Sequence, residues 1–405
     1  MLGGLLVIII TGVISFSVID SLKRKFPFID ASLLQKMFFY HLLLFFAYYG
    51  YAYFNSSDSQ FYYTKVINDF RGDTWADFYG TSTTFIEFVG YPFIRYLNFS
   101  YEAIMALFAW FGYLGFVFFY IFFKENIKFK HTFFGYDLIT LFFFLPNIHF
   151  WSASFGKGSI IFLALGLYFF GISKLKSRWL TTLVAGIIIY HIRPHIMLVV
   201  LISSAIGFVF SSKGLSLTWR ILFLIGAAVA FFYIFQDVLS MVGLDDETLL
   251  TEGLDMSHRA KELGKATSGV DISNYNLPML LFTFLYRPLF IDAPGALGIV
   301  VSFENVFYVL MTLQLFKSGQ GFTYPVRAGF LAKSAFFSFL TVSIALAQVS
   351  GNLGIAMRQK SQVMLLLLFV IISFLDEQKL DQWKLRQARK KKMERTKRIL
   401  EKGNP

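Results

Sequence analysis

The chain has 405 residues, 56% of them hydrophobic and 20% aromatic, and it carries a formal net charge of +12. With apolar runs recurring along its length and a mean hydropathy of +0.59, this composition excludes an ordinary soluble enzyme and predicts a polytopic, all-α membrane protein. The absence of cysteine excludes disulfides, thiolate nucleophiles and thiolate metal sites.

The apolar runs give the predicted helices in chain order. The first, LGGLLVIIITGVISF, has no basic residues ahead of it and no small-residue cleavage site, so we expect a retained helix rather than a signal peptide. In all we predict about eleven transmembrane helices, near residues 2–20, 37–54, 101–123, 137–151, 160–173, 179–191, 195–211, 221–243, 296–316, 329–350 and 362–375. They form a transmembrane domain over residues 1–375, followed by a basic tail over residues 376–405.

The distribution of charge orients these helices. If the polar segments alternate between the two sides, one set holds 26 of the 37 basic residues: 21–36, 124–136, 174–178, 212–220, 317–333 and the tail. The positive-inside rule places that set in the cytoplasm and the amino terminus outside. Arg193, Arg287 and Arg358 then face the exterior, each in a short polar break between apolar runs.

Two long outer segments, 55–100 and 244–295, together carry 13 of the 25 acidic residues. The first is aromatic-rich and sparsely charged, which predicts helices lying in the membrane interface. The second turns apolar at NLPMLLFTFLYRPLFIDAPG, which is too short and too interrupted by proline for a clean span. We expect it to lie over a cavity or to re-enter the membrane.

The tail holds 11 Lys or Arg residues against 5 acidic ones. Because this concentration supplies half of the excess positive charge, anionic lipid explains it more simply than nucleic acid does. We therefore expect contact with membrane lipids and no nucleic-acid partner.

The middle of the chain is rich in cationic and polar side chains. FLPNIHFWSASFGKGS contains His149 and Lys157, and YHIRPHI contains Arg193 and His195. Guanidinium and ammonium groups at a membrane boundary predict a pocket for a phosphate or pyrophosphate. The alternatives are snorkelling of the basic side chains to the headgroups and packing roles for the histidines.

Further candidates lie outside this region. Arg287 precedes Pro288, which favours an extended backbone, and Arg358 and Lys360 lie in GNLGIAMRQKSQ. Glu304, deep in an apolar run, must form an ion pair, with Arg287 and Arg358 as candidate partners, or be protonated or take part in catalysis.

Asp58 is a candidate general base or, alternatively, the N-cap of a helix that begins at Ser59. No HExxH motif, acidic metal cluster or Gly-rich phosphate loop occurs in the sequence. We therefore expect no metal and no cofactor.

Four segments together, FLPNIHFWSASFGKGSIIFLALGLYFF, YHIRPHI, FLYRPLF…FEN and NLGIAMRQK, resemble the EpsG-like and Wzy-type polysaccharide polymerases over residues 40–375. The resemblance implies a GT-C-type membrane glycosyltransferase on the outer face of the bacterial cytoplasmic (inner) membrane. Such an enzyme polymerises undecaprenyl-pyrophosphate-linked oligosaccharide repeats into O-antigen or exopolysaccharide, with a flippase and a chain-length regulator as possible partners.

The resemblance also implies roles for single residues. Arg193, Arg287 and Arg358 would bind the pyrophosphate, with Lys157, Lys360 and His149 beside them, and His195 or Asp58 would be the base, with Glu304 a third catalytic candidate. One alternative is a GT-C transferase with a polyprenyl-phosphate sugar donor, since SSDSQFYY resembles the first-loop aspartate of such enzymes. The other is a transporter or flippase, although the ionisable residues gather near one face rather than at the midplane.

Overall fold

The computed structural model describes residues 2–211, 216–242, 268–272, 274–317 and 319–402. Over these residues the fold is all-α apart from one small antiparallel hairpin, in which β1 (Thr132–Phe133) pairs with β2 (Tyr136–Asp137). The first part of the second outer segment, residues 244–267, lies outside the described residues.

The helices of the first half are α1 (Leu2–Lys25), α2 (Ala31–Phe54), α3 (Asp58–Ile67), η1 (Trp75–Phe78), α4 (Thr83–Tyr91), η2 (Pro92–Tyr96), α5 (Tyr101–Asn126), α6 (Leu138–Phe142), α7 (Pro146–Trp151), α8 (Lys157–Ser173), α9 (Leu175–Ile192) and α10 (Pro194–Val209). Those of the second half are α11 (Leu217–Val242), α14 (Leu277–Tyr286), η3 (Phe290–Asp292), α15 (Gly295–Phe316), α16 (Gln320–Arg327), α17 (Phe330–Val349), α18 (Leu353–Lys360) and α19 (Met364–Lys402).

Among the described residues, six helices are long and apolar enough to cross a membrane: α1, α2, α5, α11, α15 and α17. Three further apolar helices, α8, α10 and α14, are shorter. This confirms the all-α character of the described chain and is compatible with a polytopic membrane protein, whereas the eleven spans and the GT-C-like arrangement stay predictions. The α14 helix has 10 residues, a length of about 15 Å, which is about half the thickness of a bilayer core and too short for a span.

Two predicted spans differ from the structure. The span near residues 137–151 is divided, because Asp137 caps α6 by accepting a hydrogen bond from Thr140 N at 2.9 Å and Pro146 starts the separate helix α7. The span near residues 362–375 is the buried beginning of α19, which continues without a break for 39 residues.

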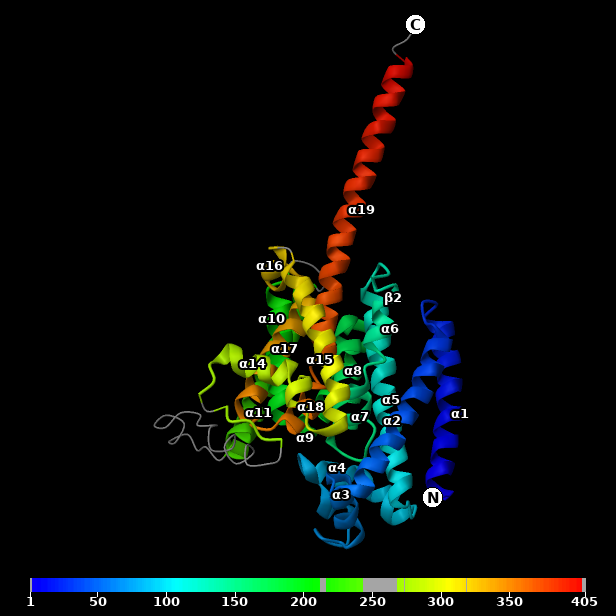
Figure 1. Ribbon diagram of the computed structural model, residues 1–405, viewed down its shortest axis with the longest axis vertical. Coiled ribbons are helices and arrows are strands. Elements are labelled where there is room, and N and C mark those ends of the chain that lie inside the picture. The colour runs from blue at the N-terminus through cyan, green and yellow to red at the C-terminus, as the bar shows by residue number, and fades with distance from the viewer. Residues whose placement is uncertain (1, 212–215, 243–267, 273, 318, 403–405) are drawn as a thin grey trace.

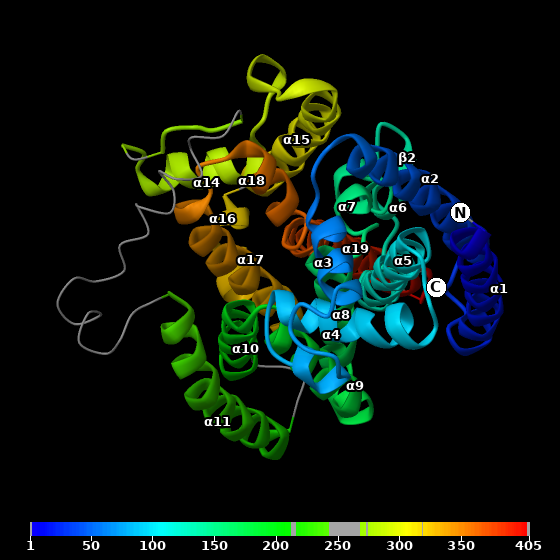
Figure 2. The same cartoon turned by 90° about the horizontal axis from the view of Figure 1, so that it is seen from below.

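The α5 helix lies between α1 and α8 and packs against both and against α2, whereas α11 lies at an outer edge (Figure 2). Glycines allow the close approach of helices on which this packing depends. A Cβ atom on Gly112 of α5 would lie 2.0 Å from the carbonyl oxygen of Ser152, just after α7, whereas a Cβ atom on Gly50 of α2 would meet nothing within 4 Å.

We predict that Gly112→Ala destabilises the protein by about 3 kcal/mol, because α5 must move away from the α7 segment. Gly50→Ala is the matched control and should leave stability unchanged. The measurement is the melting temperature of the purified protein in detergent. Equal melting temperatures for the two variants would show that α5 and α7 do not pack this closely.

The polar segments gather at two opposite ends of the bundle, as alternation along the chain predicts. The amino terminus, α3 and α4 lie at one end, here called the α3–α4 end, and the β hairpin and α16 lie at the other (Figure 1). At this second end Asp376 of α19 accepts hydrogen bonds from the backbone N–H groups of Lys128 and Phe129 at 2.8–3.1 Å.

Because the chain has no cysteine, single cysteines can be labelled without background. We predict that Ser56→Cys, at the α3–α4 end, reacts with an impermeant maleimide in intact spheroplasts. Gln382→Cys, on α19, should react only after the membrane is permeabilised. Labelling of both sites in intact spheroplasts would contradict the proposed arrangement across the membrane.

The course of α19 bears on the basic tail. The helix is largely buried as far as Asp376 and exposed from Asp381 onward, and it leaves the bundle along the long axis of the molecule (Figure 1). A helix of 39 residues is about 58 Å long, so most of the basic residues are carried away from the bundle rather than along its end surface. Contact with anionic lipid stays a prediction, and the geometry favours it only for the first turns after Asp376.

Candidate functional site

The α3–α4 end of the bundle brings together Asp58 and Arg358, which lie 300 residues apart in the chain. Asp58 is the first residue of α3 and Arg358 lies in the last turn of α18; Nη1 of Arg358 donates to Oδ2 of Asp58. Their side chains remain 50% and 29% exposed, respectively. The N-cap of α3 is Ser57, so the alternative of Asp58 as the N-cap is wrong: the helix begins one residue earlier than expected.

Aromatic side chains surround this ion pair. The guanidinium carbon of Arg358 lies 5.8 Å from the ring centroid of Trp151, within the range of a cation–π contact. Burial and, to a smaller extent, the charge of Asp58 raise the pKa of Tyr62 to about 12, while the charge of Arg358 acts in the opposite direction. The pair is therefore a charged, partly open site with apolar walls, a setting in which electrostatic interactions are stronger than in bulk water.

A buried polar network holds α18, and with it Arg358, in place. Asn352 caps α18 by accepting from Ile355 N at 3.1 Å, and Nδ2 of Asn147 donates to the carbonyl oxygen of Met357 at 2.8 Å. The fully buried Lys360 donates to Oδ1 of Asn305 and to the carbonyl oxygens of Arg287 and Leu285, the last two at 3.0 and 3.4 Å. Arg358 is thus positioned from α7, α15 and the chain after α14.

Glu304 belongs to this network. Its side chain is 3% exposed and accepts hydrogen bonds from the backbone N–H of Asn147 at 2.8 Å and from the hydroxyl of Tyr308. Burial lowers the pKa of the neighbouring Lys360 amine, and the negative charge of Glu304 acts in the opposite direction. These contacts differ from the expected ion pair with Arg287 or Arg358, and they place both Glu304 and Lys360 behind α18 rather than at the open site.

Arg287 is connected to α18 through its backbone carbonyl group rather than through its guanidinium. Its guanidinium pairs with Asp292 in the same loop, while its carbonyl oxygen accepts the hydrogen bond from Lys360. Arg287 and Arg358 are therefore linked through α18, but each guanidinium has its own aspartate partner.

Lys157 lies in a neighbouring group of contacts. Its Nζ donates to Oγ of Ser82 at 2.8 Å, the backbone N–H of Ser82 donates to the carbonyl oxygen of His191 at 2.6 Å, and the hydroxyl of Tyr79 lies 2.9 Å from Nε2 of His191. The hydroxyl of Tyr62 lies against Thr83, the residue after Ser82. Tyr62 thus connects the Asp58–Arg358 pair to the contacts of Lys157.

Arg193 and His195 lie at the junction of α9 and α10, next to His191, and both side chains are half-buried. Arg193 ends α9, where its N–H donates to the carbonyl oxygen of Ile189 at 2.8 Å, and it precedes Pro194 at the start of α10. The described contacts connect this junction to Ser82 through His191, rather than directly to Arg358.

His149 lies in the interior, away from the charged residues. It is fully buried, its Nδ1 lies 2.9 Å from Nδ1 of His41, its Nε2 lies 2.9 Å from the carbonyl oxygen of Phe143, and its ring stacks on Phe116. Because both ring nitrogens already have partners, the expected role of His149 beside a pyrophosphate is not supported by its position.

Sequence reasoning missed several residues that shape this site. Trp151, Tyr62 and Ser82 gave no signal among the many aromatic and hydroxyl residues of the chain. Over the ranges that the structure describes, no group of three or more histidine or acidic side chains is arranged to hold a metal ion. Comparisons with protein-family models, curated proteins and solved structures find no match to this chain.

Proposed function

We propose that the chain is a GT-C-type glycosyltransferase that polymerises undecaprenyl-pyrophosphate-linked oligosaccharide repeats on the outer face of the bacterial cytoplasmic membrane. The observation that carries this proposal is the Asp58–Arg358 pair, an acid and a permanent cation in a partly open site at one end of a membrane bundle. The charge distribution assigns that end to the exterior. The resemblance of four segments to polysaccharide polymerases adds support.

The pair can supply both halves of the transfer. The oxygen of the acceptor hydroxyl attacks the anomeric carbon of the donor sugar, and the bond from that carbon to the pyrophosphate oxygen breaks. The proton of the acceptor passes to the Asp58 carboxylate, and the leaving pyrophosphate keeps the electron pair of the broken bond. Arg358, exchanging its aspartate partner for the pyrophosphate, stabilises the charge that develops there.

The neighbouring cations fit the same substrate. Lys157, connected to the pair through Tyr62, offers a point charge to the second phosphate, and Arg193 lies beyond it at the α9–α10 junction. In the proposed enzyme, the buried Glu304 and Lys360 position α18 rather than contact the sugar.

The test is reconstitution. The full chain, in nanodiscs, receives undecaprenyl-pyrophosphate-linked repeat units extracted from a strain that lacks its gene. We expect longer oligosaccharides and release of free undecaprenyl pyrophosphate. Transfer only from a polyprenyl-phosphate sugar would replace the proposal with the other GT-C reaction. Movement of the lipid across a vesicle without any sugar transfer would replace it with transport.

A further inference from the structure

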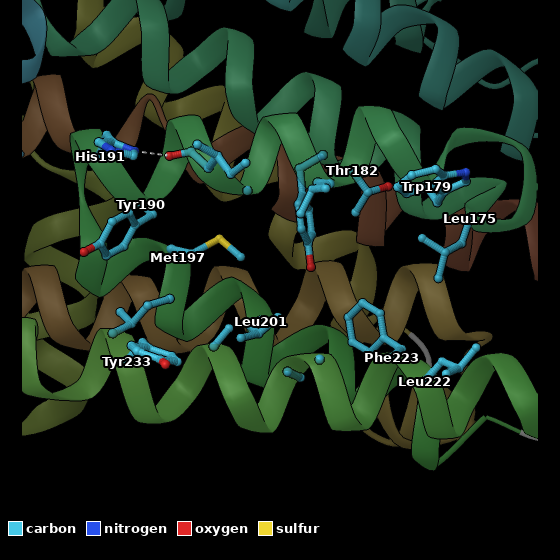
Figure 3. Close-up of a pocket in the computed structure, with 18 of the residues that line it drawn as sticks. Leu175, Trp179, Thr182, Tyr190, His191, Met197, Leu201, Leu222, Phe223 and Tyr233 are labelled. Carbon is cyan, nitrogen blue, oxygen red and sulfur yellow. Dashed lines mark hydrogen bonds between the residues drawn. The ribbon is translucent and has the colours of Figure 1, made fainter.

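A long apolar groove runs between α9, α10 and α11, beside the site but separate from the Asp58–Arg358 pair (Figure 3). Its volume is about 660 Å³. Trp179 lines one end and His191 the other, a separation of about 18 Å along α9. The groove therefore follows more than half the thickness of a bilayer core of about 30 Å.

The two ends of the groove differ in chemistry. Between them the lining is almost entirely apolar, with Leu183, Met197, Leu201 and Phe223 among its residues. At one end His191 and Tyr190 meet the groove, and the carbonyl oxygen of His191 accepts the N–H of Ser82, whose hydroxyl holds Lys157. An apolar chain lying in the groove would thus end beside a cation at the α3–α4 end.

We propose that this groove binds the polyisoprenoid chain of the lipid carrier, with the phosphate next to that chain, which is the second one counted from the sugar, bound at Lys157. This inference rests on the proposed function and adds to it the position at which the lipid carrier binds. A lipid that presents its pyrophosphate to Arg358 must enter from the bilayer, and α11, most of whose side chains from Leu217 to Tyr233 are exposed, bounds the groove on its outer side.

The lining favours a methyl-branched chain over a straight acyl chain. The lining residues on α11 include the small Gly226, Ala227 and Ala230, whereas Gly186 on α9 lies against Met197, whose methyl carbon would be 3.2 Å from an added Cβ atom. A Cβ atom on Gly226 would meet nothing within 4 Å. Open space of this kind gives room to methyl branches, and each buried carbon adds to affinity.

The test fills the groove and measures binding without any sugar transfer. Gly226→Phe places a ring in the groove without displacing backbone, and Ala230→Phe is a second, independent filling variant. The control is Gly50→Phe on α2, where the added side chain is equally unopposed. The probes are undecaprenyl pyrophosphate and the short geranyl pyrophosphate, each titrated against the full chain in nanodiscs.

We expect both filling variants to weaken undecaprenyl pyrophosphate binding about tenfold, equivalent to losing roughly two buried methylene groups, and to leave geranyl pyrophosphate binding unchanged. Unchanged affinity for the long probe would overturn the proposal. The proposal would also be overturned if a photoreactive phospholipid labelled α9 and α11 and undecaprenyl pyrophosphate did not displace it. If the chain binds the long probe in this way but transfers no sugar, the proposed function fails and the groove assignment stands.

Discussion

Arg358→Lys should lower the rate of polymer formation by about 10²–10³-fold while the protein still inserts in the membrane. Lysine keeps the positive charge but loses the planar fork that can bind two oxygens of a pyrophosphate. It also loses the flat cation that lies over Trp151. The measurement is oligosaccharide length over time in nanodiscs, and polymer ladders in a strain that lacks the chromosomal copy, where single repeat units should accumulate.

The matched control is Arg95→Lys. Arg95 pairs with Asp69 at 2.8 Å within the same outer segment and is similarly exposed, but it lies outside the site. Its replacement should leave the polymer unchanged. If Arg358→Lys also leaves the polymer unchanged, Arg358 merely extends to the membrane surface, as snorkelling predicts, and pyrophosphate binding by this residue is excluded.

Asp58→Asn separates the role of the base from that of the cation. If Asp58 removes the proton of the acceptor, this variant should lose about 10²–10⁴-fold in rate while retaining affinity for undecaprenyl pyrophosphate. A variant that keeps the wild-type rate, with only its affinity altered, would show that Asp58 positions Arg358 and that the base is another group.

A large effect on stability is expected at Lys360. Lys360→Met removes the buried ammonium, leaving Asn305 and the carbonyl oxygens of Arg287 and Leu285 without their donor and Glu304 without its neighbouring cation. Breaking a buried charge arrangement from one side costs about 3–5 kcal/mol. We therefore expect a large drop in the melting temperature of the purified protein and loss of the α18 position on which Arg358 depends.

Two further variants test whether the loss of stability in Lys360→Met comes from the buried charges. Adding Glu304→Gln to Lys360→Met should recover part of the stability, because the uncompensated negative charge is then removed. Lys384→Met, on the exposed part of α19 where the lysine is 61% exposed, should have no effect. If the double variant is no more stable than Lys360→Met, the charge of Glu304 does not interact with Lys360.

The sequence by itself predicted that this chain folds in a lipid bilayer and that its polar segments form two groups, one on each side. The apolar runs predicted an all-α membrane bundle because a bilayer forces the backbone to satisfy its own hydrogen bonds. The alternation of segments placed residues 55–100 on the same end as the breaks that contain Arg193 and Arg358. Counting spans was less successful, because a divided segment such as α6 and α7 has nearly the same hydropathy as one continuous helix.

The tertiary structure alone decided which charged residues share a site. The local pattern around Arg358, Lys360 and Arg287 is similar, a cation near a turn, yet only Arg358 emerges beside Asp58, whereas Lys360 turns inward to Asn305. For His149 likewise, the sequence could not decide between substrate binding and a packing role. The structure places it in the interior against His41. These outcomes depend on contacts between segments up to 300 residues apart. Periodicity and composition report only whether a helix has an apolar environment, and the partner that satisfies a buried polar group is supplied by whichever helix packs against it.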